Sequence, residues 1–368
     1  MLDEDKSGRT AGVATERRQR RRGNDMLSLR RRNFAIWALA WAAVTTAGAL
    51  PARAAASRTI RVGILALTSH APTIIAAGKG YFAKEGLEAK LVSFQAAEPM
   101  AVAIASGDID FGVTAITGGL ISLADKGALK VIGGALEEAP GVEGEKILVS
   151  KAAYKAGVTT PARLKGRSFG ITTAGSSFQY MAHKIAQKEG FPDSGIHLRP
   201  LQKIPVLIAA LTSGQIDAWS IVPNIADRLI KGGRVVEIGK ISDFIPHYQV
   251  TVVFTSTANI NHRRGLVKRF LAAYSKGVAD YNAALVDKTM PQKETDAIVA
   301  MIHKYVYASE PLAKADPLIR AGAMRISPDA RMNLKNIKDQ LDWFKSQRLV
   351  PADSSMAKLV NKSFVPTD

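Results

Sequence analysis

Small hydroxyl residues surround a glycine in residues 172–178 (TTAGSSF), between an apolar stretch and a helical one. A glycine at such a turn lets the backbone approach a ligand closely, and the free N–H groups that begin a helix attract a carboxylate, sulfonate or nitro-type anion. We therefore predict a binding site for a small anion at Gly175, Ser176 and Ser177. The structural alternative is an ordinary capped start of a helix. No Gly-Lys-Ser/Thr follows, so the loop is not a Walker phosphate loop.

Other segments place polar or aromatic side chains where strands are expected to end. Open α/β sheets bind ligands at the carboxyl ends of their strands, where loops and helix starts converge. An aromatic ring there can form one wall of a pocket, and a second one can close it. Helix capping and core packing are the alternatives. The candidate ligand-binding residues in these segments are Ser69, His70, Gln95, Thr114, Ala115, Trp219 and Tyr248.

Residue types that support metal or nucleophilic chemistry are scarce. The chain has no cysteine and six histidines, none paired as His-x-x-x-His. Thiolate nucleophiles, cysteine-ligated zinc and iron–sulfur clusters are therefore excluded. No Ser/His/Asp or paired-carboxylate arrangement stands out. We predict a protein with no catalytic residue, no metal and no cofactor.

The elements that must position these residues follow an alternating α/β pattern that occurs twice. The residues 62–64 (VGI) match 169–171 (FGI) at an offset of 107, and Ser-Gly-x-Ile-Asp at 106–110 recurs at 213–217. Asp110 and Asp217 are equivalent in the repeat, so we interpret both as structural. The predicted strands are 59–67, 88–94, 109–113, 167–172, 196–201 and 216–220, and the predicted helices are 72–84, 100–106, 178–189 and 206–212.

Two apolar segments, 146–150 and 249–255, fit neither copy of the repeat. Strands there would carry the chain from one lobe to the other and back. We predict lobe 1 at 57–148 and 252–368, and lobe 2 at 149–251. The remainder is predicted to be helical at 262–284, 294–307 and 327–346, with Ser327 and Pro328 as N-cap and first residue of the last helix and a core-facing stripe of Leu334, Ile337, Leu341 and Phe344.

The first 56 residues have the layout of an export signal. Arg30, Arg31 and Arg32 precede an uncharged stretch at 34–50, which ends in a small-x-small site at 52–54. A retained membrane anchor is the alternative. The segment also resembles a twin-arginine export signal, so the route is open between that and the general one. We predict a periplasmic protein, cleaved after residue 54 or 56, that starts at Met26 and, without cysteine, is not a lipoprotein.

Composition and charge limit the function further. The chain is 47% hydrophobic with a mean hydropathy of +0.02, which excludes a disordered chain and a polytopic membrane protein. The formal net charge is +18, and past residue 56 the basic excess is spread along the chain. Nucleic-acid binding needs a concentrated basic stripe, so we predict none. A diffuse positive field attracts small anions.

Four motifs in order resemble one transport family. They are GYFAKEGL at 80–87, ASGDIDFG at 105–112, LKGR at 164–167 and LTSGQID at 211–217. They are similar to the nitrate/sulfonate/taurine group of ABC-transporter substrate-binding proteins over residues 58–365. The resemblance implies a type II periplasmic-binding fold, with two α/β lobes, two crossover strands and a helical C-terminal region. It also implies a monomer that captures a small anion by hinge closure and delivers it to an ABC permease and ATPase.

Three alternatives stay open. His70-Ala71-Pro72 also resembles the binders of thiamine precursors, which would imply a pyrimidine or another neutral heterocycle as the ligand. An enzyme on this fold is the second alternative, although the relatives that build a pyrimidine from their own histidine use a cysteine-rich iron motif that this chain lacks. The third is a sensory or partner-binding protein without transport.

Overall fold

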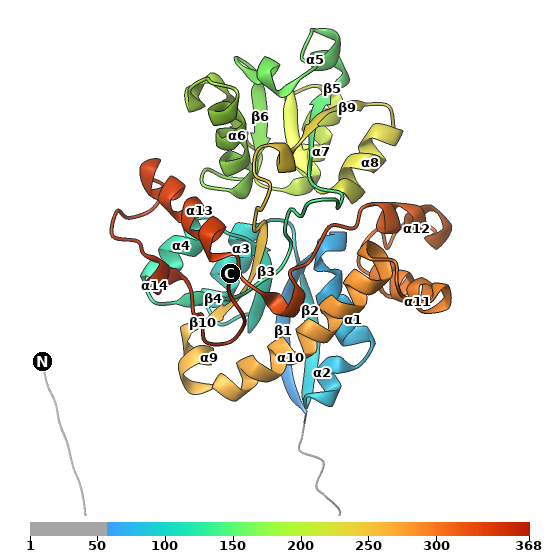
Figure 1. Cartoon of the computed structure of the whole chain (residues 1–368), viewed down its shortest axis with the longest axis vertical. Helices are drawn as coiled ribbons and strands as arrows, with labels where there is room; N and C mark the ends of the chain where they lie inside the picture. The colour runs from blue at the N-terminus through green and yellow to red at the C-terminus, as the bar shows by residue number, and fades with distance from the viewer. Residues whose placement is uncertain (1–56) are drawn as a thin grey trace, which may run out of the picture. The chain divides into compact units, whose positions relative to one another are not determined.

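Two five-stranded mixed sheets organise the chain in a computed structural model that describes residues 57–368 (Figure 1). The predicted export signal and start at Met26 lie outside these residues. The first sheet has the order β2-β1-β3-β10-β4 and the second β7-β6-β8-β5-β9. We refer to each sheet with the helices packed on it as lobe 1 and lobe 2. The strands are β1 Arg58–Leu65, β2 Leu87–Phe94, β3 Phe111–Ala115, β4 Leu129–Gly134, β5 Lys146–Ser150, β6 Ser168–Ile171, β7 His197–Pro200, β8 Ala218–Ile221, β9 Val235–Lys240 and β10 Thr251–Ser256.

The two sheets repeat one design, as the matched motifs predicted. In the first, β1 pairs parallel with β2 and β3, while β10 pairs antiparallel with β3 and β4. In the second, β6 pairs parallel with β7 and β8, while β5 pairs antiparallel with β8 and β9. Each antiparallel strand also has a register shift in its pairing with the outer strand: β10 between Val253 and Phe254, and β5 between Ile147 and Leu148. The predicted α/β fold class is confirmed.

The two predicted strands outside the repeat are the ones that the chain reaches by crossing from one sheet to the other. The segment predicted at 146–150 is β5, which lies inside the second sheet. The segment predicted at 249–255 returns as β10, which lies inside the first sheet but begins at Thr251. Gln249 precedes the strand because its backbone groups pair with side chains: its N–H donates to Asn336 Oδ1 and its carbonyl accepts a hydrogen bond from Gln340 Nε2.

Asp110 and Asp217 have the structural role that their equivalence indicated. The Asp110 carboxylate accepts the backbone N–H of Arg61 at 2.8 Å, which joins the start of β3 to β1. The Asp217 carboxylate accepts both the N–H and the hydroxyl of Ser168 at 2.8 Å, which joins β8 to β6. Each aspartate therefore fixes the register of two parallel strands.

Most predicted helices occur near their predicted positions, with two corrections. The helix predicted at 72–84 is two helices, α1 Ala71–Gly78 and α2 Tyr81–Lys84, because Gly80 between them has a φ of 70°. The other helices are α3 Ala97–Ala105, α4 Gly118–Asp125, α5 Lys151–Lys155, α6 Ser177–Lys188, α7 Ile204–Ser213, α8 Pro223–Lys231, α9 Thr257–His262, α10 Arg264–Tyr281, α11 Gln292–His303, α12 Leu312–Ala321, α13 Leu334–Ser346 and α14 Met356–Leu359. The sequence did not predict α4, α5, α8, α9, α12, α14, β4 or β9.

The second correction concerns the start of the helix predicted at 327–346. Pro328 opens only a 3-10 turn, Pro328–Ala330, and α13 begins at Leu334. Asn333 is its N-cap, because its side-chain oxygen accepts the N–H of Asn336. The predicted stripe does pack inward, with Ile337, Leu341 and Phe344 buried and Leu334 packed against the core.

Helix α13 also contacts lobe 2. Trp343 packs against Tyr180 of α6 with ring centroids 5.3 Å apart, and Asp339 pairs with Lys184 at 2.8 Å. A second contact joins α8 to the loop before α12, where Arg228 pairs with Glu310 at 2.6 Å. No helix within residues 57–368 is long and apolar enough to span a bilayer.

The two Asp217 hydrogen bonds predict a measurable stability contribution. Replacing Asp217 with alanine leaves the Ser168 N–H and hydroxyl without their acceptor, so the free energy of unfolding should fall by about 1–3 kcal/mol. Asp217→Asn keeps an acceptor oxygen and should lose less. Urea unfolding of the three proteins tests this, and an alanine variant as stable as the parent would contradict the structural role.

Candidate functional site

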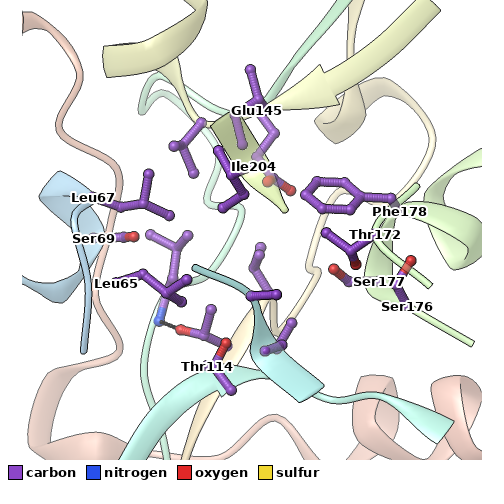
Figure 2. Close-up of a pocket in the computed structure, with 18 of the residues that line it drawn as sticks. Leu65, Leu67, Ser69, Thr114, Glu145, Thr172, Ser176, Ser177, Phe178 and Ile204 are labelled. Atoms are coloured by element: carbon purple, nitrogen blue, oxygen red, sulfur yellow. Dashed lines mark hydrogen bonds between the residues drawn. The ribbon is translucent and has the colours of Figure 1, made fainter. Parts of the chain in front are cut away.

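A cavity lies between the two lobes, at the carboxyl ends of β1, β3 and β8 (Figure 2). Its empty volume is about 570 Å³, a value that includes space open to solvent. Residues of both lobes line it: Leu65, Leu67, Ser69, His70, Ala96, Ala97, Thr114, Ala115, Thr117, Leu136, Glu145, Thr172, Ser176, Ser177, Phe178, Ile204, Ile221, Val222, Val250 and Thr251. Six of the predicted residues are among them: Ser69, His70, Thr114, Ala115, Ser176 and Ser177.

The walls of the cavity are mostly apolar. Figure 2 shows Leu65 and Leu67 on one side and Phe178 on the other, with Ile204 between them. Trp219 does not line the cavity, because it is fully buried behind Phe178 with ring centroids 5.6 Å apart. The aromatic wall is therefore Phe178, and the tryptophan supports it. These surfaces suit a ligand with an apolar body.

Four polar atoms on this cavity are buried without a hydrogen-bond partner in the described part of the chain. They are Ser69 Oγ, His70 Nδ1, Glu145 Oε2 and Ser176 Oγ. Buried polar groups are nearly always hydrogen-bonded, since an unsatisfied one costs about 1–3 kcal/mol. These four atoms are therefore available to hydrogen-bond a polar molecule in the cavity.

The start of α6 presents free donors to the cavity. Ser176 is the N-cap residue, but its hydroxyl makes no capping hydrogen bond. Gly175 has a φ of 75° and donates its N–H to the side chain of Gln179. The N–H groups of Ser177 and Phe178 open the helix and have no partner within it. The positive end of the helix dipole therefore faces the cavity together with two serine hydroxyls.

The start of α4 is also near the cavity, but a side chain of the protein already occupies it. Thr117 caps the helix by accepting the N–H of Leu120 and donates its hydroxyl to Glu98 at 2.7 Å. The Glu98 carboxylate lies against the first turn, where a Cβ on Gly119 would be 1.4 Å from it. Of these two helix starts, α6 is the one that can accept an anion.

His70 is electrically neutral in the cavity. Complete burial lowers the pKa of its imidazole from 6.5 to about 3. At neutral pH it therefore offers one N–H donor and one acceptor, and no charge. Within residues 57–368, no lysine or arginine lines the cavity. An anion bound here would be held by dipoles and hydrogen bonds.

Glu145 is the acidic residue of the cavity that the sequence did not predict, as Phe178 is the aromatic one. Glu145 lies on the crossover from β4 to β5, outside the loops where strands were expected to end. Its side chain is buried, and burial together with the neighbouring Glu138 raises the pKa of its carboxyl well above the usual value. The only signal in the sequence was an acidic residue immediately before an apolar strand.

Three predicted residues contribute to the surroundings of the cavity and do not line it. Gln95 acts through its backbone, since its carbonyl accepts the N–H of Ile204 from the other lobe at 3.3 Å. The Gly175 carbonyl accepts the N–H of Gly118, again across the lobes, at 2.9 Å. Tyr248 is fully buried and packs against Tyr180, with ring centroids 5.4 Å apart.

A protein-family model described as NMT1/THI5 like matches residues 67–284, more than half of the chain. The chain belongs to this family. No curated protein sequence matches this NMT1/THI5-like chain. Within residues 57–368 there is no group of three or more His, Cys, Asp or Glu side chains that could hold a metal ion.

Solved structures similar to this NMT1/THI5-like protein share its fold. The alkanesulfonate-binding protein SsuA from Xanthomonas axonopodis pv. citri, bound to MOPS, has a TM-score of 0.64 at 19% identity over 83% of this chain and 98% of that one. The aliphatic sulphonate binding protein SsuA from Escherichia coli gives 0.62 at 20% identity, over 83% and 92%. A ligand-binding component of an ABC-type import system from Staphylococcus aureus, with zinc bound, gives 0.65 at 17% identity, over 83% and 97%.

The buried, neutral His70 predicts a pH dependence of stability. Its pKa is about 3 in the folded protein and about 6.5 in the unfolded chain, so the unfolded chain binds the extra proton between these values. This contribution to stability is complete above pH 6.5 and is lost as the pH falls toward 3. Between pH 5.5 and 4.5 it should lower the free energy of unfolding by about 1.3 kcal/mol.

The matched variant is His70→Asn, which does not titrate. Urea unfolding at both pH values should show a smaller acid loss for the variant than for the parent, by that amount. Equal losses in the two proteins would contradict a neutral buried His70.

Proposed function

We propose that this chain is the substrate-binding component of an ABC importer, which captures a small molecule between its two lobes. The observation that carries the proposal is the convergence of four unpartnered polar atoms on one cavity lined from both lobes. Family membership and the fold shared with import-system binding proteins support it. The protein would act in the periplasm as a monomer, and its partners would be a permease and an ATPase.

The ligand would carry an anionic or acceptor group at the start of α6. Ser176, Ser177 and the free N–H groups of that helix are the donors there, and Phe178 with the leucines of β1 and its following loop would cover an apolar body. A sulfonate or an organic carboxylate has an anionic group for the donors and an apolar body for the apolar walls. Nitrate has no apolar body, so it fits this cavity less well. A neutral heterocycle is the second candidate, since His70 is neutral and no cationic side chain of the described part of the chain lines the cavity.

The mechanism would be hinge closure with no bond broken in the ligand. The proposed lobes are the predicted ones, 57–148 with 252–368 and 149–251, except that all of β5 belongs to the second sheet. They are joined through the segments that lead into β5 and into β10. Opening would break the Gly118–Gly175 hydrogen bond and the pairs Lys184–Asp339 and Arg228–Glu310. These contacts would reform around a bound ligand, and a permease would recognise the closed form.

Ligand binding should raise thermal stability and compact the protein. A screen of small sulfonates, carboxylates and pyrimidines should yield compounds that raise the melting temperature, because a ligand at a hundredfold excess over Kd stabilises the native state by about 2.7 kcal/mol. With such a compound, small-angle scattering should show a smaller radius of gyration, and the compound should be recovered unchanged. An unchanged radius at saturation would contradict hinge closure, and a converted compound would indicate an enzyme.

The serine hydroxyls should matter for affinity. Ser176→Ala or Ser177→Ala should weaken binding of an anionic ligand from the screen by about 1.5–3 kcal/mol, the range for hydrogen bonds to charged groups, or roughly ten- to a hundredfold in Kd. Thr173→Ala is the matched control, because Thr173 is in the same loop but does not line the cavity. Titration calorimetry on folded variants measures this. Serine variants that bind as tightly as the control would show that the loop only starts a helix.

A further inference from the structure

The segments on either side of α12 contact the start of α8 in lobe 2. Helix α12 packs on α11, which packs on α1 of lobe 1, whereas α8 packs on β5 and β9 of the second sheet. Figure 1 shows both helices on the right of the molecule, with α8 above α12. Helix α8 directly follows Ile221 and Val222, which line the cavity. This contact therefore connects lobe 1 to one wall of the candidate site.

Asn224 of α8 is fully buried in this contact, and Tyr307 of lobe 1 supplies its hydrogen bonds across the lobes. The Tyr307 hydroxyl donates to the Asn224 carbonyl at 2.6 Å and accepts from Asn224 Nδ2 at 3.2 Å. Burial raises the pKa of this hydroxyl to about 12, so it remains a donor at neutral pH. Asn224 Oδ1 has no hydrogen-bond partner in the described chain. One tyrosine thus holds both the backbone and the side chain of Asn224.

The turn that presents Tyr307 has an unusual backbone. Tyr307 has a φ of 60°, in the left-handed region that residues other than glycine seldom adopt. The N–H of Glu310 closes the turn by donating to the Tyr307 carbonyl at 2.9 Å, and the Glu310 carboxylate pairs with Arg228 of α8 at 2.6 Å. The Arg228 guanidinium also lies 5.2 Å from the centre of the Tyr307 ring. Backbone strain of this kind is concentrated at functional segments.

Gly322, just after α12, allows the backbones of the two lobes to meet. A Cβ on this residue would lie 2.3–2.4 Å from the N, Cα and Cβ atoms of Asn224, far inside van der Waals contact. The φ of Gly322 is −90°, which alanine also adopts. The requirement for glycine therefore comes from the approach of Asn224, and alanine at this position would act as a wedge between the lobes.

We propose that Tyr307 and Gly322 are positioning residues that form a clasp with Asn224 and close the two lobes in a substantial fraction of molecules before a ligand binds. The closed clasp would set Ile221 and Val222 in place as a preformed wall of the cavity. The inference rests on the proposed function, and it deepens it, because the apparent Kd is the intrinsic value divided by the closed fraction. None of the three clasp residues lines the cavity, so the clasp would strengthen the binding of unlike ligands by the same factor.

Spin labels can measure the closed fraction directly, because the chain has no cysteine of its own. Val102→Cys on α3 and Ala209→Cys on α7 place one label at an exposed position of each lobe. Pulsed electron paramagnetic resonance on the ligand-free protein should show two inter-label distances, one of them the distance expected from this structure. Adding Gly322→Ala should lower the ratio of closed to open molecules roughly tenfold or more, since the wedge overlaps backbone atoms.

A second variant tests the clasp without a wedge. Tyr307→Phe keeps the ring but removes the hydroxyl that holds Asn224, so the ratio of closed to open molecules should fall by about threefold to tenfold. This milder change decides the inference if Gly322→Ala fails to fold, which circular dichroism would show.

Two matched controls make the same substitutions outside the clasp. Gly265→Ala lies on α10, where a Cβ would meet nothing within 4 Å. Tyr305→Phe lies in the same turn region as Tyr307, but Tyr305 is 39% exposed. Both controls should keep the distance distribution of the labelled parent.

The outcomes separate this inference from the proposed function. A ligand-free parent that shows only the open distance, or clasp variants that keep the parent's distribution, would overturn the inference. In both cases the proposed function stands if compounds of the screen still stabilise the parent and compact it. A screen in which no compound stabilises the protein would overturn the proposed function, while the distances in the ligand-free protein would still decide whether the clasp closes the lobes.

Discussion

Each sheet contains one antiparallel strand that the chain reaches only by crossing from the other sheet, and the rest of the structure depends on this constraint. β5 leaves the first lobe and pairs between β8 and β9, and β10 returns to pair between β3 and β4. Both strands lie inside their sheets, so neither lobe can complete its hydrogen bonding without chain that has crossed over. Because the repeat also matches the directions of the remaining strands, the loops at the carboxyl ends of β1, β3 and β8 face one another, and the cavity forms between them.

The same two crossings explain why buried polar residues lie on the segments that connect the sheets. Gln249 stands just before β10, where its backbone N–H donates to Asn336 and its side chain reaches the carbonyls of Leu136 and Thr251. The crossover toward β5 carries Glu138 and Glu145, which the two adjacent lobes bury. The side chain of Gln249 is hydrogen-bonded within the protein, whereas Oε2 of each glutamate has no partner in the described chain.

The sequence predicted the parts that local patterns determine. β5 is a short apolar run and was located at its observed bounds, and the turn at Gly175 was identified as the start of α6. It could not predict β9, whose residues after Val235 are only half-buried and show no apolar run. Ser327-Pro328 has the local signature of a helix start, but tertiary contacts override it and the helix begins at Leu334. Whether Phe178 or Trp219 faces the cavity depends on how α6 packs on β8, and Glu145 enters the cavity only through the crossover.

The contact between Gly118 and Gly175 has a consequence for the timing of ligand exchange. Neither residue has a side chain, so the two backbones meet directly, and a Cβ on Gly175 would lie 3.5 Å from the Cα of Gly118. In the proposed hinge mechanism, a ligand would leave the cavity only after this contact and the salt bridges between the lobes separate. The residence time of the ligand would then be set by the opening rate of the protein, and different ligands would share a similar upper limit on how fast they dissociate.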